Sequence, residues 1–336
     1  MSAAPATRRG ILAGGNWIID HFKLIDAWPA QDALANIVGQ SWSGGGSPCN
    51  LLKDLARLRG GFPLAAVGLL GDDADGQRII EDCRAHGIDT TQLRVTREAP
   101  TSFTDVMSVQ STGRRTFFHM RGANALLDRG HFDFTASAAK IFHLGYLLLL
   151  DRIDQPGVAP RLLADARAAG FKTSVDLVSE DSNRFQSVVL PALPHTDYLF
   201  ANDFEAERLT GIMLGRGPAL DRAAVERAGR ALIAAGVREW AVIHFPEGAC
   251  ACSASGEIVW QASVHVPAAE IQGTAGAGDA FAAGVLVGLH ETWPMVRSLE
   301  LGVCAAASCL RLPTCSDAVL PVAECLALGT KWGFRA

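Results

Sequence analysis

The chain has 336 residues, of which 49% are hydrophobic and 19% are charged, a composition typical of a soluble globular protein with one large domain or two ordinary ones. Its formal net charge of −5 and the absence of long Lys/Arg runs argue against a nucleic-acid partner. No apolar run approaches the roughly 20 residues that span a bilayer, and 11–13 is too short for a signal-peptide core. We therefore expect no membrane segment and a cytoplasmic location.

The N-terminal third mixes short strands with helices. Periodicity and glycine stops predict a strand over 11–13, a helix over 51–58, a buried strand over 64–70 and a helix over 79–86. Just before the first helix lies the run Ser43-Gly44-Gly45-Gly46-Ser47-Pro48-Cys49-Asn50. Consecutive glycines allow a ligand close to the backbone, and Asn50 can donate and accept at once. This pattern suits a polyhydroxylated ligand, and a turn with Asn50 capping the helix is the alternative.

A small second sheet is predicted from strands that have no helix attached. Segments 18–25 and 34–41 are strand-like, and 101–110 and 115–120 flank a hairpin turn at 111–113. We expect these pieces, about 18–42 and 100–121, to form a lid on a single domain covering 1–336. An apolar sheet too small to hide its faces invites a partner, so we expect a homodimer through the lid.

From residue 140 onward, strands and helices alternate. This rhythm predicts a doubly wound, mainly parallel α/β sheet covered on both faces. The expected strands are 141–144, 172–176, 198–201, 240–244, 249–253 and 257–262, and the expected helices are 160–169, 222–235, 296–310 and 318–328.

The eight cysteines are scattered and include no CxxC pair. The closest spacing is Cys250-Ala251-Cys252, with no histidine nearby to complete a metal set. We expect buried free thiols in a reducing compartment and no zinc site.

Two polar motifs follow strands in the second half. Asn202 and Glu205 have the i, i+3 spacing that places them on one helix face, although a capping box would use the same spacing. The run Gly273-Thr274-Ala275-Gly276-Ala277-Gly278-Asp279 precedes an apolar helix, which is the layout of an anion pocket at a helix N-terminus. A carboxylate there repels phosphate, but it can accept a proton from a hydroxyl that attacks phosphate. The alternative is an Asp that stabilises the helix start.

Several common catalytic signatures are absent from the sequence. There is no GxxxxGK[ST], HExxH or GxSxG motif, and no strand is followed by GxGxxG. The chain is therefore not a P-loop enzyme, and a nicotinamide-binding fold is unsupported.

In their order, the motifs resemble those of the ribokinase family, also called the phosphofructokinase-B family of carbohydrate kinases. The resemblance covers nearly the whole chain. It rests on the opening strand 15–20 with Asp20, the first signature at 45–50, the turn 68–76, the lid segments 114–116 and 122–124, the NxxE motif at 202–205 and the second signature at 274–279.

The resemblance implies a role for each matching residue. Asp279 would be the catalytic base, and the backbone N–H groups of Gly276, Ala277 and Gly278 would hold the transferred phosphoryl group. The substrate would bind at Asp20, Gly45, Gly46 and Asn50, and ATP at Asn202, Glu205, Gly248 and Thr274, with Glu205 orienting Mg²⁺ through water. The implied reaction is ATP-dependent phosphorylation of a primary hydroxyl on a sugar or sugar-like molecule.

Two departures and three alternatives remain open. Gly273 stands where the family usually has Asp, which predicts weak potassium activation, and Leu52 stands where a small residue is usual. A nucleoside kinase is one alternative, with Trp17 and Phe103 stacking a base. A sugar-phosphate kinase and an inactive sugar-binding regulator are the others; the intact Asp279 argues against the regulator. A second phosphate would be held by Lys23, Arg114, Arg115 or Arg121.

Overall fold

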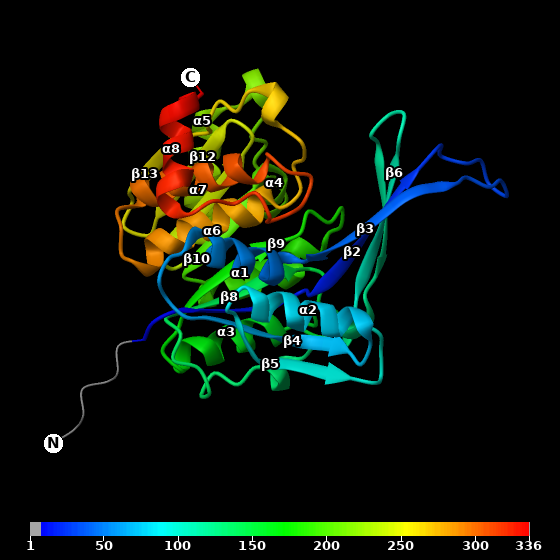
Figure 1. Ribbon diagram of the computed structural model, residues 1–336. Helices are drawn as coiled ribbons and strands as arrows, with labels where there is room; N and C mark the ends of the chain where they lie inside the picture. Colours follow the sequence, from blue (N-terminus) through cyan, green and yellow to red (C-terminus); the bar gives the residue numbers. More distant parts are fainter. Residues whose placement is uncertain (1–7, 336) are drawn as a thin grey trace.

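The computed structural model describes residues 8–335 and contains one large and one small sheet (Figure 1). The large sheet has nine strands in the order β13-β12-β11-β10-β9-β8-β1-β4-β5. Their bounds are β1 (Ile11–Gly15), β4 (Leu64–Gly71), β5 (Asp89–Thr96), β8 (Ile141–Leu147), β9 (Lys172–Leu177), β10 (Tyr198–Asn202), β11 (Trp240–Phe245), β12 (Gly248–Ser253) and β13 (Ile258–Ala262).

Seven of these strands are parallel, and only the last two, β12 and β13, join in antiparallel register. The helices are α1 (Ser47–Leu58), α2 (Ala74–Ala85), α3 (Val158–Ala168), α4 (Asp203–Thr210), α5 (Arg222–Ala234), α6 (Ala277–His290), α7 (Met295–Cys309) and α8 (Val322–Trp332).

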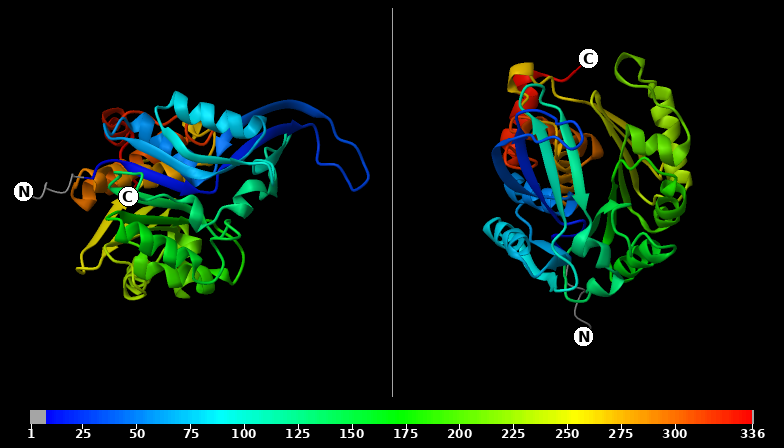
Figure 2. Two further views of the ribbon diagram at one scale, coloured as in Figure 1. Left: turned by 90° about the horizontal axis from the view of Figure 1, so that it is seen from below. Right: turned by 90° about the vertical axis from the view of Figure 1, so that its right-hand side faces the viewer.

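Helices cover both faces of the large sheet (Figure 2). Successive residues of β1 pack into different cores. Ile11 and Ala13 belong to the core shared with α1, α2, α6, α7 and α8, whereas Leu12 belongs to the core shared with α3, α4 and α5. Successive residues of a strand face opposite sides, so a strand buried on both faces is apolar throughout. The predicted doubly wound, mainly parallel sheet is confirmed.

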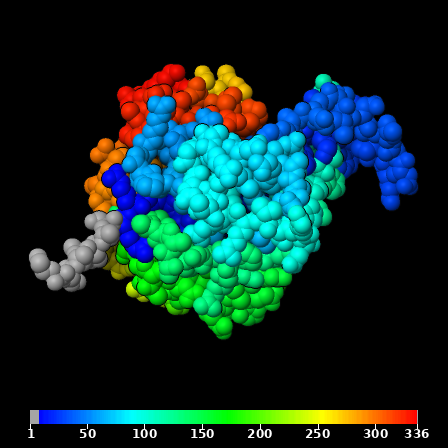
Figure 3. Space-filling model, turned by 60° about the horizontal axis from the view of Figure 1, so that its bottom comes forward, coloured from blue at the N-terminus to red at the C-terminus, as the bar shows by residue number. Residues whose placement is uncertain are grey.

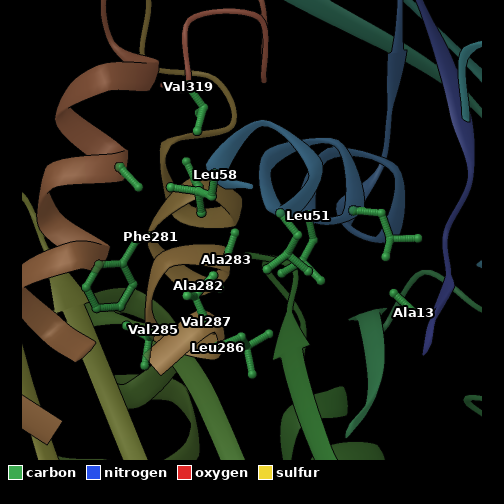
Figure 4. Packing of buried hydrophobic residues seen from close by; sticks show 14 of the residues in the cluster. Ala13, Leu51, Leu58, Phe281, Ala282, Ala283, Val285, Leu286, Val287 and Val319 are labelled. Carbon is green, nitrogen blue, oxygen red and sulfur yellow. The ribbon is translucent and has the colours of Figure 1, made fainter. Parts of the chain in front are cut away.

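The packing of α1 against α6 positions the site. Leu51 and Leu58 of α1 lie beside Ala282, Ala283 and Leu286 of α6 in the core (Figure 4). The two N-termini meet at the edge of the sheet where the parallel strands end, since Asn50 of α1 contacts Asp279 of α6. In open α/β sheets this edge is where ligands bind.

The small sheet has the order β3-β2-β6-β7, formed by β2 (Ile18–Ile25), β3 (Ile37–Gly45), β6 (Phe103–Val109) and β7 (Arg115–Met120). It stands out from the body of the molecule (Figures 1 and 3). The predicted second sheet is confirmed; its action as a lid stays a prediction.

The sequence predicted the wrong starting residue for three helices, α1, α2 and α8. Helix α1 begins at Ser47 with Pro48 in its first turn, where the missing N–H costs nothing, so Asn50 lies inside the helix and does not cap it. Helix α2 begins at Ala74 because Asp73 caps it by accepting from Gly76 N at 2.8 Å. Helix α8 begins four residues later than expected, directly after Pro321. The edge strand β5 was not predicted.

The expected buried free thiols are confirmed. All eight cysteines are free and buried. Within residues 8–335, no helix combines the length and apolar character needed to cross a membrane.

Candidate active site

The N-terminus of α6 is a helix start without a side-chain cap. Its N-cap residue is Gly276 at φ 77°, and a Cβ there would collide with the backbone of Cys315, so this position requires glycine. The first amide groups of a helix have no acceptor within it. Gly276 and Gly278 line a cavity of about 270 Å³, which places this uncapped helix start beside space for an anion.

Asp279 lies in the first turn of α6 and is 4% exposed. Asn50 Nδ2 donates to its Oδ2 over 2.9 Å, although the two residues are 229 positions apart in the chain. Burial, and then the nearby Asp176 carboxylate, raise the pKa of Asp279 to about 8, whereas hydrogen bonds from Asn50, Tyr146 and Ser47 oppose the rise. The Asp279 carboxyl group can therefore take up and release a proton near neutral pH.

Asp176 is a second carboxylate of this cavity that sequence reasoning missed. It is the last but one residue of β9, and it accepts from Ser47 Oγ at 2.5 Å and from the backbone N–H of Tyr146 at 2.7 Å. The signal was available, because an Asp at the carboxyl end of a predicted parallel strand lies at the ligand-binding edge. With Glu205 and Asp279 it makes the cavity strongly acidic.

Asn202 and Glu205 do form a capping box at the start of α4. Glu205 N donates to Asn202 Oδ1, and Asn202 N donates to Glu205 Oε2, both over 2.9 Å. Both residues also line the acidic cavity. Burial raises the pKa of Glu205 to about 7, opposed by bonds from Asn202 and Ser179. Capping and a role in the cavity are therefore compatible, because the capping hydrogen bonds hold the side chains of Asn202 and Glu205 at the cavity wall.

A second, largely apolar cavity of about 370 Å³ adjoins the acidic one at the α6 start. Both cavities are lined by Asn202, His244 and Gly278. The apolar wall comes from α6, α7 and the strand region near Val264, and Gly248, Thr274 and Ala277 complete the lining. A flat apolar group could lie here with a charged extension reaching the helix start.

Asp20, Gly45, Gly46 and Asn50 form a further group beside the α6 start, where Asn50 donates to Asp279. Gly45 lies against the Asp20 carboxylate, where a Cβ would collide with it, and Asn50 N donates to Gly46 O over 3.0 Å. Burial raises the pKa of Asp20 to about 6, and a hydrogen bond with Thr104 opposes the rise. A buried carboxylate of this kind is a strong acceptor for ligand hydroxyl groups.

Two buried polar residues beside these groups were also missed. The side-chain amide of Asn16, next to Gly46, and both carboxylate oxygens of Asp54, one turn along α1 from Asn50, have no hydrogen-bond partner among the described residues. Burial, and then Asp279, raise the pKa of Asp54 well above its usual range. No local pattern in the sequence distinguishes either residue.

The proposed stacking pair for a nucleoside base is wrong. Trp17 is fully buried in the main core, where its Nε1 donates to Val67 O over 2.9 Å. Phe103 pairs with Ile19 in the register and stacks on His21, with ring centroids 5.5 Å apart. Because neighbours on a strand alternate faces, Phe103 and His21 lie on the face opposite Asp20.

Gly273 lies against Pro313 and Leu312 of the loop after α7. Within residues 8–335, no cluster of three or more His, Cys, Asp or Glu side chains is arranged to hold a metal ion. Weak potassium activation stays a prediction.

Comparison with known proteins gives concordant matches. The model for the pfkB family carbohydrate kinase matches residues 16–321. An ATP-dependent ribose-1-phosphate kinase of Halopiger xanaduensis is 28% identical over 291 residues, covering 86% of this chain and 88% of that protein. A 5-dehydro-2-deoxygluconokinase of Geobacillus kaustophilus is 24% identical over 298 residues, covering 83% and 82%. The structure of an Arabidopsis thaliana ribokinase complexed with ribose and ATP shares the fold, with TM-score 0.80 and 22% identity over 96% of this chain and 98% of that one.

Proposed function

The chain belongs to the pfkB family of carbohydrate kinases, which phosphorylate sugars with ATP, and from this premise we propose that it transfers the γ-phosphoryl group of ATP to a primary hydroxyl of its sugar. The observation that carries the proposal is the place of Asp279. It lies at an uncapped helix start that borders both the apolar and the acidic cavity, and it accepts a hydrogen bond from Asn50, which belongs to the group around Asp20. A donor and an acceptor of phosphate would meet at that point.

Asp279 acts as the base in this proposal. The sugar hydroxyl is hydrogen-bonded by the Asp279 carboxylate, which takes its proton as the oxygen attacks the γ-phosphorus. The backbone N–H groups of Gly276, Ala277 and Gly278 bind the equatorial oxygens of the transferred group, where negative charge is concentrated. Asn50 keeps the carboxylate oriented through its bond to Oδ2. Asp20 fixes the sugar by accepting from other hydroxyl groups.

ATP would place its base in the apolar cavity beside Gly248 and Thr274, and its phosphates at the start of α6. Mg²⁺ neutralises phosphate charge during such transfers and keeps several of its water ligands. The acidic cavity fits a hydrated cation, because Asp176 and Glu205 offer carboxylate oxygens to its waters. We further propose a cytoplasmic location, where ATP is made and where thiols such as the eight free cysteines stay reduced.

The deciding experiment is ATP turnover by the purified protein across a panel of sugars and nucleosides. We expect at least one sugar to be phosphorylated, with the product identified by mass spectrometry. Sugar binding without any ATP turnover would instead identify an inactive sugar-binding regulator. Turnover confined to nucleosides would identify a nucleoside kinase.

Glu205→Gln should raise the Mg²⁺ concentration for half-maximal activity by about 10- to 100-fold, the usual loss when an outer-shell partner of a metal is removed. The amide oxygen of Gln still accepts from Asn202 N, so the cap of α4 is kept. Glu207→Gln is the matched control on the same helix, because Glu207 bonds to Leu214 N and Arg216 instead of lining the cavity. The measurement is a MgCl₂ titration at fixed ATP. An unchanged Mg²⁺ dependence in Glu205→Gln contradicts this role.

The small sheet exposes many large apolar side chains. They are Leu24, Trp28, Leu34, Ile37, Val38, Trp42, Phe117, Phe118 and Met120. Monomers rarely leave so much apolar surface open, and we propose that a second copy of the chain covers it.

Light scattering at micromolar protein should therefore give the mass of a dimer. Phe118→Asp, which places a charge where Trp28 and Phe118 stack, should give the mass of a monomer. A monomeric wild-type protein would refute this assembly.

A further inference from the structure

The register of the small sheet sorts its side chains between two faces. Asp20 pairs with Thr104, and Leu24 pairs with Ser108, which in turn pairs with Arg115 of β7. Directly opposite residues share a face, as do residues two or four positions apart on one strand. Asp20 and Arg115 therefore lie on the same face, the one that holds the sugar pocket.

A cavity of about 290 Å³ lies farther out on that face. It begins at Phe22, two residues beyond Asp20, and is closed from the main body by Pro313 and Thr314 of the loop after α7. Two strand residues span ~6–7 Å, about the length of a pentose or hexose. A sugar held at Asp20 would direct its far end into this cavity.

The lining of the cavity favours a negative charge. Its polar lining residues are Lys23, Gln40, Ser41, Ser108, Arg115 and Thr314, and no Asp or Glu of the described chain lines it. By the register, Ser41, Ser108 and Arg115 lie on the face of Asp20, whereas Lys23 and Gln40 lie on the other face. The cavity thus contrasts with the acidic cavity on the ATP side. Thr314 Oγ1 is buried and has no hydrogen-bond partner among residues 8–335. A hydroxyl group left in this state is costly unless a ligand completes it.

Arg115 is the basic side chain that remains available in this region. The other candidates are occupied: the Lys23 ammonium is paired with Asp105 on the opposite face, and Arg121 is paired with Asp151. Arg115 makes no salt bridge with any residue in the described range 8–335. Arg114, at the hairpin turn, lies outside this cavity.

We propose that this cavity is an anion subsite of the sugar pocket, and that the preferred substrate is a sugar bearing a phosphate or carboxylate group at the end distal to the phosphorylated hydroxyl. Arg115 binds the anionic oxygens, and Thr314, Ser41 and Ser108 donate the remaining hydrogen bonds. A guanidinium group suits this task because it binds phosphate and carboxylate in a bidentate manner. The assignment rests on the proposed sugar-kinase function and adds the substrate class.

The test compares kcat/KM for neutral sugars with that for the same sugars carrying a phosphate or a carboxylate. The wild-type protein should favour the anionic member of a pair by at least 10-fold. Arg115→Gln should lower the ratio of anionic to neutral kcat/KM by about 10- to 100-fold, the range expected for loss of a charge-assisted contact. Arg114→Gln removes the same charge one residue away and should leave the ratio unchanged.

The outcomes separate the two proposals. Turnover of neutral sugars without any anionic preference, or equal effects of the two arginine variants, overturns the subsite but leaves the kinase function intact. Isothermal titration of the same compounds without ATP makes the test independent of turnover: the wild-type protein should bind the anionic sugar more tightly than Arg115→Gln does. Equal binding by both proteins also overturns the subsite. The phosphate and carboxylate arms, read separately, identify which anion is preferred.

Discussion

Asp279→Asn is expected to lower kcat by about 10²- to 10⁴-fold, the usual share of a positioned general base. The amide cannot take the proton of the sugar hydroxyl, but its oxygen still accepts from Asn50 Nδ2, so the local geometry is kept. Sugar and ATP KM values should therefore stay within a few-fold of wild type. Steady-state kinetics with the best sugar of the panel measures both effects. A variant with near wild-type kcat would show that Asp279 is not the base.

The pKa of Asp279 adds two checks on this result. Because the folded-state pKa is raised from 3.8 to about 8, the folded protein binds the proton more tightly than the unfolded chain does. Stability contributed by this group is therefore complete below about pH 4 and is lost as the pH rises toward 8. At pH 7, Asp279→Asn should consequently unfold at the same or a higher temperature than wild type. The kcat/KM of wild type should also fall on the acid side of about pH 8, where the carboxylate becomes protonated.

Asp54→Asn is the matched control for the base. Asp54 is likewise a fully buried carboxyl group close to Asp279. It lies on α1, one turn after Asn50, and it lines neither the apolar nor the acidic cavity. Its replacement should change kcat by no more than about 3-fold, an effect far below the share of a base. A loss as large as that of Asp279→Asn would mean that replacing any buried carboxyl group near the site, and not loss of proton transfer, accounts for the result.

Asp20→Ala should raise the sugar KM by roughly 10- to 100-fold, since hydrogen bonds to a charged group are worth about 1.5–3 kcal/mol and each 1.4 kcal/mol is a factor of ten. The ATP KM should change little, because Asp20 lies on the small sheet and does not line the apolar cavity. Both KM values come from one two-substrate kinetic experiment.

Asp105→Ala provides the control for Asp20. Asp105 lies on the same small sheet next to Thr104, but it faces the other side and is paired with Lys23 and His21. Its removal should leave the two KM values in their wild-type ratio. If Asp20→Ala raises the sugar and ATP KM values equally, Asp20 does not bind the sugar, and the pocket has to be placed elsewhere.

Local patterns predicted most elements of the fold and failed at particular boundaries. Glycine stops after helices and apolar runs in buried strands are signals carried by neighbouring residues, so the alternation from residue 140 onward predicted the parallel sheet. The start of α1 was placed too late because Gly-Gly-Ser-Pro is typical both of a turn and of a helix start with Pro in its first turn. Strand β5, polar on its exposed face at the sheet edge, lacks the apolar run that identifies a buried strand.

The sequence by itself determined the order of the motifs, the identity of the base candidate and the family to which they point, because these are properties of short segments. The tertiary structure alone decided which side chains meet. Asn50 and Asp279 come together because parallel strands end at one edge of the sheet, and Asp176 joins them for the same reason. Register, which depends on pairing between distant strands, placed Phe103 on one face of the small sheet and Arg115 on the other, the face of Asp20. Burial then set the proton affinities of Asp20, Glu205 and Asp279, since desolvation depends on the atoms around a carboxyl group and not on its neighbours in the chain.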